Sequence, residues 1–223
     1  ALGDCMSIPP EYDDPSRTLI GAEQEQWFGE QLRASRDAQT IWRLVGNKVV
    51  FSPVVDPQGG TELTSDFWEG YRAQRKRVID QIVGDGITNI VFLTGDIHTS
   101  WAIDVAQDPF NAASYNPTTG EGAFGVEFVG PSVTSPALEG TATADIVPFV
   151  IQGANPQVKY SEVTRKGYVL VDVTPAQVQA EWYFVNTIKA PDDPSETLAT
   201  SFLVRADAPH LEAVATPTAP KPN

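Results

Sequence analysis

The chain has 223 residues, of which 41% are hydrophobic and 20% are charged, which is the balance of a soluble globular protein with one substantial core. Its 29 acidic and 15 basic residues give a formal net charge of −14, which repels nucleic-acid backbones and argues against a nucleic-acid-binding module. The one cysteine excludes an internal disulfide, and no run reaches the roughly 18 apolar residues of a membrane-spanning helix.

The first part of the chain predicts an irregular lead-in, a helix and two short β-rich runs. Residues 1–20 are rich in Pro and Asp and predict the lead-in. Apolar residues recur at helical spacing over 22–36 and predict a helix there. The β-rich runs at 40–45 and 48–52 are separated by Gly46-Asn47, which is typical of a tight hairpin turn, although other connections between such strands exist.

A second helix and a buried strand follow. Asp66 is expected to cap this helix, with Glu69 at the capping-box position, and the helix is expected to end near Gly84. Residues 89–93 then form a continuous apolar run, as in a strand that is covered on both faces. Helix, glycine-rich turn and buried strand make half of an α/β unit, and ligand sites in such sheets form beyond the carboxyl ends of the strands.

The remainder is β-rich and ends in a tail. Short connectors between its later strands predict an antiparallel meander, and Asp104 is interpreted as a surface residue of an alternating strand. The tail contains several prolines and is expected to be poorly ordered, so we divide the chain into a lead-in at 1–20, one domain at 21–207 and a tail at 208–223. Strands are expected at 101–106, 123–129, 158–163, 167–173, 178–186 and 200–206.

Chemistry is expected first at Asp96 and His98, directly after the buried strand. A carboxylate and an imidazole separated by one residue can reach into one cavity from an irregular backbone. Taken alone, the pattern also fits a capping Asp and a structural His. The other histidine, His210, lies in the tail, and we expect no functional role for it.

Three aromatic residues are candidates for lining a substrate cleft. Trp68 and Tyr71 lie on the second predicted helix, and Trp101 closely follows His98. The alternative interpretation for all three is packing in the hydrophobic core.

Several long segments in one order resemble the carboxyl-terminal half of the PhoD-like alkaline phosphatase/phosphodiesterase family, over about residues 16–206. The segments that carry the resemblance are Gln24–Trp27, Trp42–Asn47, Phe67–Tyr71, Thr94–Trp101, Glu127–Pro136, Asn155–Pro156, Arg165–Tyr168 and Gln179–Trp182.

The resemblance implies an α/β (α+β) fold, a metallo-dependent phosphatase-like β-sandwich flanked by helices, of which this chain is the carboxyl-terminal half. It implies hydrolysis of small phosphate mono- and diesters by a dinuclear metal site, with iron and calcium as the associated metals. Asp96 and His98 match the family's last metal-binding motif and would be ligands. A periplasmic or secreted location is implied by the family alone.

The departures from the family pattern limit what this chain does alone. The other metal-binding motifs lie upstream of anything present here, and nothing around Cys5 matches the family's Cys element. Gly46-Asn47-Lys48 is not the Gly-Asn-His motif of metallophosphatases, so Asn47 is interpreted as a turn residue. Where family members commonly have Asn-Pro-His, this chain has Gln157 in place of the His.

Two ligands cannot hold two metals. We therefore expect an amino-terminal half, in cis or in trans, to complete the site. The chain alone is expected to bind metal weakly, hydrolyse little and self-associate through exposed strand edges. The alternative function is that of a non-catalytic β-rich binding module or an inactive fragment.

Overall fold

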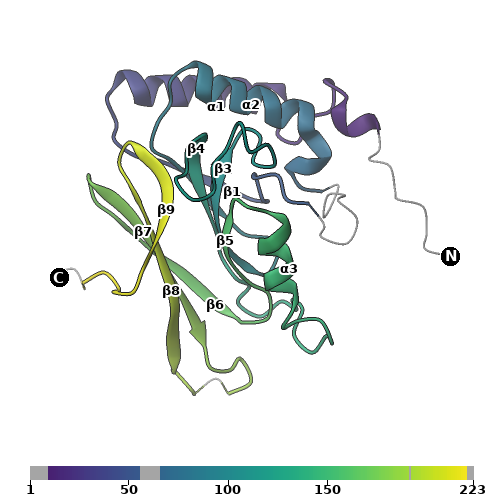
Figure 1. Cartoon of the computed structure of the whole chain (residues 1–223), viewed down its shortest axis with the longest axis vertical. Coiled ribbons are helices and arrows are strands. Elements are labelled where there is room, and N and C mark those ends of the chain that lie inside the picture. The colour runs from purple at the N-terminus through teal and green to yellow at the C-terminus, as the bar shows by residue number, and fades with distance from the viewer. Residues whose placement is uncertain (1–9, 56–65, 191, 220–223) are drawn as a thin grey trace.

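A computed structural model describes residues 10–55, 66–190 and 192–219. It consists of two stacked β-sheets with two long helices across the outer face of one of them (Figure 1). The helices are η1 (Pro10–Asp13), α1 (Gly21–Asp37), η2 (Trp68–Tyr71), α2 (Arg72–Gly84) and α3 (Val147–Ala154). The β-sandwich flanked by helices that the sequence predicts is therefore confirmed.

The first sheet has five strands in the order β1-β2-β4-β3-β5, in which β1, β2 and β4 are parallel and β3 and β5 are antiparallel to their neighbours. The second sheet is an antiparallel meander in the order β6-β7-β8-β9. The meander that the short connectors predict is confirmed for β6 and β7 but is wrong for β5, which pairs with β3 in the first sheet, so the chain crosses between the sheets from β5 to β6. The strands are β1 (Arg43–Asn47), β2 (Ile90–Thr94), β3 (Ser100–Ala106), β4 (Ala123–Val129), β5 (Val158–Glu162), β6 (Gly167–Val173), β7 (Gln177–Val185), β8 (Glu196–Arg205) and β9 (Ala208–Val214).

Strand β2 shows why its sequence is apolar throughout. Ile90 and Phe92 pack beneath α1 and α2, whereas Val91 packs against the second sheet. Successive side chains of a strand point to opposite faces, so a central strand with a helix layer on one side and a sheet on the other needs apolar residues at every position. The prediction of a strand covered on both faces is confirmed.

The core between the sheets centres on Trp182 of β7, which is fully buried. Its ring meets Phe128 of β4 edge-on with centroids 5.7 Å apart, and Phe202 of β8 edge-on at 6.1 Å. The indole Nε1 donates a hydrogen bond of 3.0 Å to the carbonyl oxygen of Val129, so the polar end of the ring is satisfied as well.

Several local predictions are wrong. Residues 48–52 form no strand and Asn47 is no turn residue, because β1 runs through Asn47 and pairs in parallel with β2 instead of forming a hairpin. Asp66 does not cap α2; a 3-10 turn begins at Trp68, and α2 starts only at Arg72. Helix α3 was not predicted.

The expected poorly ordered tail is also wrong where the structure describes it. Residues 208–214 form β9, which pairs with β8 over Ser201–Arg205 and lies against β3 and β4 of the first sheet. Strand pairing and burial of Leu211 hold this segment in place despite its weak apolar pattern. None of the helices among the described residues is long and apolar enough to cross a membrane.

Candidate functional site

The predicted ligands lie in the loop of residues 95–99 that joins β2 to β3. Asn47, Thr94 and Val129 are in register at the carboxyl ends of the three parallel strands β1, β2 and β4. The loop therefore leaves the sheet at the edge where ligand sites of α/β proteins form.

The backbone of this loop is unusual. Asp96 and His98 both adopt a positive φ, of 73° and 60°, and the N–H of Ile97 donates to the carbonyl oxygen of Gly95 at 2.9 Å. Non-glycine residues rarely occupy the left-handed region, and clusters of such residues are found at functional sites. Two left-handed residues within three positions thus coincide with the two predicted ligands.

The two side chains have different surroundings. The Asp96 side chain is 37% exposed, and its Oδ1 lies 3.3 Å from the Nζ of Lys48, whose side chain is 82% exposed. The Nδ1 of His98 lies 2.7 Å from the carbonyl oxygen of Pro136. Because a carbonyl only accepts, Nδ1 carries the hydrogen, and the Nε2 of a neutral imidazole is left with its lone pair for a metal.

The Asp96 carboxylate and the His98 imidazole are suitable donor types for a metal ion, but two donors are fewer than a metal ion needs. A carboxylate and an imidazole held by a backbone carbonyl are common ligands of divalent metals. However, the described residues include no group of three or more His, Cys, Asp or Glu residues that can hold a metal ion. Among the described residues, Asp96 and His98 thus offer two donors at the motif.

A buried carboxylate lies behind the motif. The Oε1 of Glu127 in β4 accepts hydrogen bonds from Thr94 Oγ1 at 2.7 Å and from the N–H of Phe51 at 2.9 Å, and its Oε2 accepts from the N–H of Ser52 at 2.9 Å. Thr94 in turn accepts from Asn47 Nδ2 at 3.1 Å. This network ties the ends of β1, β2 and β4 together directly below the motif loop.

Burial raises the pKa of Glu127 more than these hydrogen bonds lower it. The nearby Arg75 forms an ion pair with Glu69, and burial lowers the pKa of its guanidinium to about 10. Glu127 is not among the residues that the sequence suggested. An acidic residue within an otherwise apolar strand could have identified it, because a buried carboxylate needs hydrogen-bond partners.

The raised pKa of Glu127 predicts a specific pH dependence of stability. The folded state holds this proton more tightly than the unfolded chain, so the contribution is complete below the ordinary value of 4.5 and is lost as pH rises through the folded pKa. The difference in unfolding free energy between the natural chain and Glu127→Gln should therefore decrease as pH rises above 4.5. Urea unfolding of the natural chain and of Glu127→Gln at several pH values measures this difference in unfolding free energy.

Glu121→Gln is the matched control, because Glu121 is exposed. It should change the unfolding free energy by less than about 0.5 kcal/mol. A difference for Glu127→Gln that does not change with pH would contradict the assignment.

Residues 4–182 of the chain match the PhoD-like phosphatase family. The chain belongs to this family. The family resemblance predicted from the sequence is thereby confirmed.

Two relatives show how much of a full-length PhoD-like protein this chain covers. The chain is 34% identical over 213 residues to alkaline phosphatase D of Bacillus subtilis (strain 168), an alignment that covers 94% of this chain and 34% of that protein. A solved structure of PhoD is similar to it with a TM-score of 0.79 at 31% identity, covering 95% of this chain and 38% of that one. The chain thus spans little more than a third of the length of either relative.

The three aromatic candidates of this PhoD-like chain lie in different places. Trp101 is buried at the inner wall of a cavity of about 370 Å³ that Ile97 and Thr99 of the motif loop also line. Trp68 is buried too, but it packs against Phe51 and does not line this cavity, although Phe67 and Glu69 do. Tyr71 is partly buried, with the guanidinium of Arg17 4.5 Å from its ring centroid. The structure therefore places only Trp101 beside the motif, and the substrate-binding role of all three stays a prediction.

A second polar cluster lies outside the motif, around Asp104. Contrary to the prediction, this residue is fully buried. Its Oδ2 accepts from Tyr115 Oη at 2.8 Å and lies 2.7 Å from His210 Nδ1 and 3.3 Å from Lys159 Nζ, and its Oδ1 accepts from the N–H of Leu211 at 2.9 Å.

His210 has a structural role, because its ring helps to fix β9 to β3. The expectation that it has no functional role stays a prediction. Burial and the neighbouring Asp104 carboxylate raise the pKa of the Tyr115 hydroxyl, so it remains a hydrogen-bond donor. Asp104 and His210 are 106 positions apart, so neither strand periodicity nor local pattern could have linked them.

Proposed function

We propose that this chain supplies two ligands, Asp96 and His98, to a dinuclear metal site that hydrolyses phosphate mono- and diesters. The observation that carries the proposal is the strained loop beyond the parallel strand ends, which presents a carboxylate and an imidazole with a free Nε2. Two findings support the reaction class: the chain belongs to the PhoD-like phosphatase family, and its sequence is 34% identical to that of an alkaline phosphatase D.

The residues of this chain have separate tasks in the proposal. The Asp96 carboxylate suits a hard cation such as calcium, and the His98 imidazole suits iron. When bound, such a metal pair supplies the positive charge for the phosphoryl oxygens and the activated water for in-line attack. The Pro136 carbonyl orients the imidazole through Nδ1, and the exposed Lys48 ammonium pairs with the Asp96 carboxylate, on which a cation would bind.

We further propose that the site is divided between this chain and a longer amino-terminal part, present in cis or supplied in trans. The described residues offer two motif ligands and no group of three. A PhoD-like protein of full length would carry the remaining ligands on the two thirds that lie outside the alignment with this chain. The same membership is the basis for proposing a periplasmic or secreted location.

The divided site predicts that the purified 223-residue chain has little activity of its own. It should bind calcium and iron only weakly and hydrolyse p-nitrophenyl phosphate hardly above background, because each metal needs several protein donors. Metal content and turnover, measured with and without a chelator, give the answer. Robust hydrolysis that a chelator abolishes would refute the division.

The ligand assignment is tested in a completed protein, in which the missing two thirds of alkaline phosphatase D is joined to this chain. Asp96→Asn and His98→Ala should each lower kcat/KM by roughly 100-fold or more, because outer-shell changes alone cost 10–100-fold. Asp37→Asn is the control, because the Asp37 carboxylate is exposed at the end of α1. This change should leave kcat/KM unchanged. If the completed protein folds, binds metal and yet hydrolyses nothing, the non-catalytic binding module becomes the better interpretation.

A further inference from the structure

Thr94 is the last residue of β2 before the motif loop, and both neighbouring strands hold it. Its Oγ1 donates to the Oε1 of Glu127 in β4 at 2.7 Å and accepts from the Nδ2 of Asn47 in β1 at 3.1 Å. Its carbonyl oxygen accepts from the N–H of Gly130 at 2.9 Å. Thr94 is 7% exposed and Glu127 is fully buried, so these hydrogen bonds are shielded from water. The residue from which the loop departs is thus fixed through its side chain and its backbone.

The loop itself has little packing support directly after Thr94. A carbon added at Gly95 would meet no described residue within 4 Å. Asp96 and His98 nevertheless adopt φ angles of 73° and 60°. Non-glycine residues hold such conformations only where the surrounding structure fixes them. The support for the two left-handed residues therefore has to come from the ends of the loop and from the segments beside it.

One segment, which runs from Glu127 to Pro136, contacts the motif at two points. Glu127 and Gly130 hold Thr94 at the start of the loop. The carbonyl oxygen of Pro136 lies 2.7 Å from the Nδ1 of His98. The end of β4 and the loop after it therefore support both the strand end ahead of the motif and the imidazole within it.

Glu127 also holds the segment that faces Asp96. Its Oε1 accepts from the N–H of Phe51 and its Oε2 from the N–H of Ser52, at 2.9 Å each. Lys48 lies three residues before Phe51, and its Nζ is 3.3 Å from the Oδ1 of Asp96. A single buried carboxylate thus links the strand end before the motif with the segment beside it.

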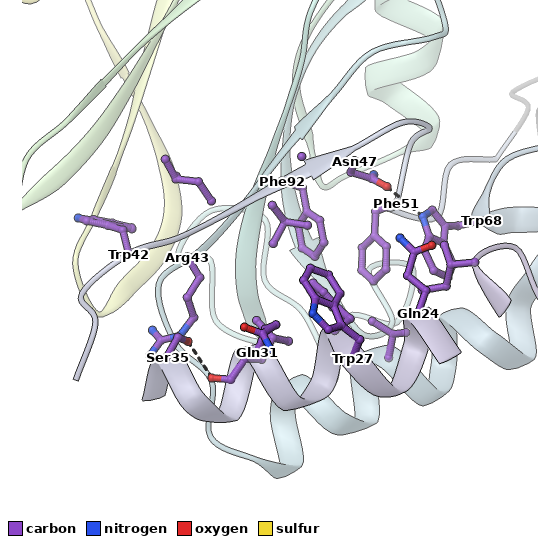
Figure 2. Close-up of a pocket in the computed structure, with 17 residues that line it drawn as sticks. Gln24, Trp27, Gln31, Ser35, Trp42, Arg43, Asn47, Phe51, Trp68 and Phe92 are labelled. Carbon is purple, nitrogen blue, oxygen red and sulfur yellow. Dashed lines mark hydrogen bonds between the residues drawn. The ribbon is translucent and has the colours of Figure 1, made fainter. Parts of the chain in front are cut away.

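Asn47 connects Thr94 to the hydrophobic core. Its Oδ1 accepts from the indole Nε1 of Trp68 at 3.3 Å, a contact drawn in Figure 2. Trp68 is buried and packs edge-on against Phe51, with ring centroids 5.3 Å apart. The hydrogen-bonded chain from Trp68 through Asn47 and Thr94 to Glu127 is therefore seated on tightly packed aromatic rings rather than on mobile surface groups.

We infer that Thr94 and Glu127 are positioning residues of the proposed metal site. The Thr94 hydroxyl, held by the Glu127 carboxylate, fixes the direction in which the loop leaves β2 and keeps Asp96 and His98 in their left-handed conformations. Both side chains spend their hydrogen-bonding groups on protein partners, so they orient the ligands instead of binding the metal. The inference rests on the proposed ligand role of Asp96 and His98.

Removing the Thr94 hydroxyl tests the conformation of the loop by NMR in the 223-residue chain itself. Thr94→Val deletes the hydroxyl and keeps a side chain of similar shape, whereas Thr94→Ser retains the hydroxyl. A positive φ brings the amide and Hα hydrogens of one residue close together, so Asp96 and His98 should each show a strong nuclear Overhauser effect between these two hydrogens. Both strong effects should be lost in Thr94→Val and kept in Thr94→Ser.

Thr174→Val is the matched control. The Thr174 hydroxyl donates to the carbonyl oxygen of Gln177 at 3.0 Å and accepts from its N–H at 3.1 Å, just after β6. The carbonyl oxygen of Thr174 accepts from Trp42, which precedes β1, whereas the motif lies beyond the other end of that strand. This change should leave the Overhauser effects of Asp96 and His98 as they are. The same result in a folded Thr94→Val chain would overturn the inference.

Titration with calcium connects the loop conformation to the ligand role. The dissociation constant, followed by the amide signals of Asp96 and His98, should rise roughly tenfold or more in Thr94→Val and change less than about twofold in Thr94→Ser and Thr174→Val. Loss of the Overhauser effects with an unchanged dissociation constant would show that the hydroxyl supports the fold alone, and would overturn the inference. If calcium shifts neither amide in the natural chain, the proposed ligand role fails, while the Overhauser comparison still decides whether Thr94 holds the loop.

The part played by Glu127 is tested by a double-mutant cycle. In Glu127→Gln, one amide oxygen replaces the two carboxylate oxygens that accept from Thr94, Phe51 and Ser52, so the calcium dissociation constant should rise roughly tenfold. Thr94→Val should then raise it by a smaller factor than in the natural chain, because two residues joined by one hydrogen bond do not act independently. A double variant in which the two single effects simply multiply would show that Thr94 does not act through Glu127.

Discussion

Replacing Asp104 by alanine should lower the free energy of unfolding by about 3–5 kcal/mol, the range for removing one partner of a buried ion pair. The buried carboxylate accepts from Tyr115 and the N–H of Leu211 and pairs with Lys159 and His210. Its removal leaves the Lys159 ammonium, whose side chain is 14% exposed, without its counter-charge. Urea unfolding at neutral pH, followed by circular dichroism, measures the loss.

Two further substitutions separate this cluster from a general effect of removing an acidic residue. Asp108→Ala, at an exposed position just after β3, should change the unfolding free energy by less than about 0.5 kcal/mol. Asp104→Asn should give an intermediate loss, because its amide oxygen can still accept from the N–H of Leu211. If Asp104→Ala is no worse than Asp108→Ala, the cluster does not anchor β9.

Replacing Trp182 by alanine should cost about 3–5 kcal/mol, the usual range for a fully buried large aromatic residue. The ring has no exposed surface and fills the space between the two sheets, against Phe128 and Phe202. The change also leaves the carbonyl oxygen of Val129 without its donor. Urea unfolding followed by circular dichroism, which does not depend on the lost tryptophan, reports the change.

Phe149→Ala is the appropriate comparison, because Phe149 is 77% exposed on α3. It should alter stability by less than about 0.5 kcal/mol. Trp182→Phe should recover part of the loss, since it restores ring volume without the hydrogen bond to Val129. Equal stability of Trp182→Ala and Phe149→Ala would mean that the two sheets do not form one cooperative core.

The elements that the sequence predicts well are those whose pattern reflects one local environment. Helix α1 and strand β2 have the periodicity of an amphipathic helix and of a strand buried on both faces, and both formed as predicted. The same reasoning placed Asp96 and His98 at a strand end, because the motif follows β2 without interruption. The family resemblance then assigned them a chemistry that periodicity alone does not contain.

The wrong predictions share a different cause, which is pairing with residues far away in the chain. Asn47 has the composition of a turn residue, yet Thr94, 47 positions later, accepts from its side chain. The segment around His210 resembles a disordered tail, yet it pairs with β8 and reaches Asp104. Short-range composition predicts an isolated segment, and tertiary contacts override it when the required partners are supplied from elsewhere.

The left-handed backbone at Asp96 and His98 has a consequence for how the chain balances stability against function. Glycine would adopt these φ angles of 73° and 60° without strain, whereas non-glycine residues in sparsely populated backbone conformations cost on the order of 1–3 kcal/mol each. The chain nevertheless holds a carboxylate and an imidazole there. A selection for thermal stability alone would therefore favour glycine at both positions and would remove the motif, so the most stable sequence for this fold is not the one that keeps the two proposed ligands.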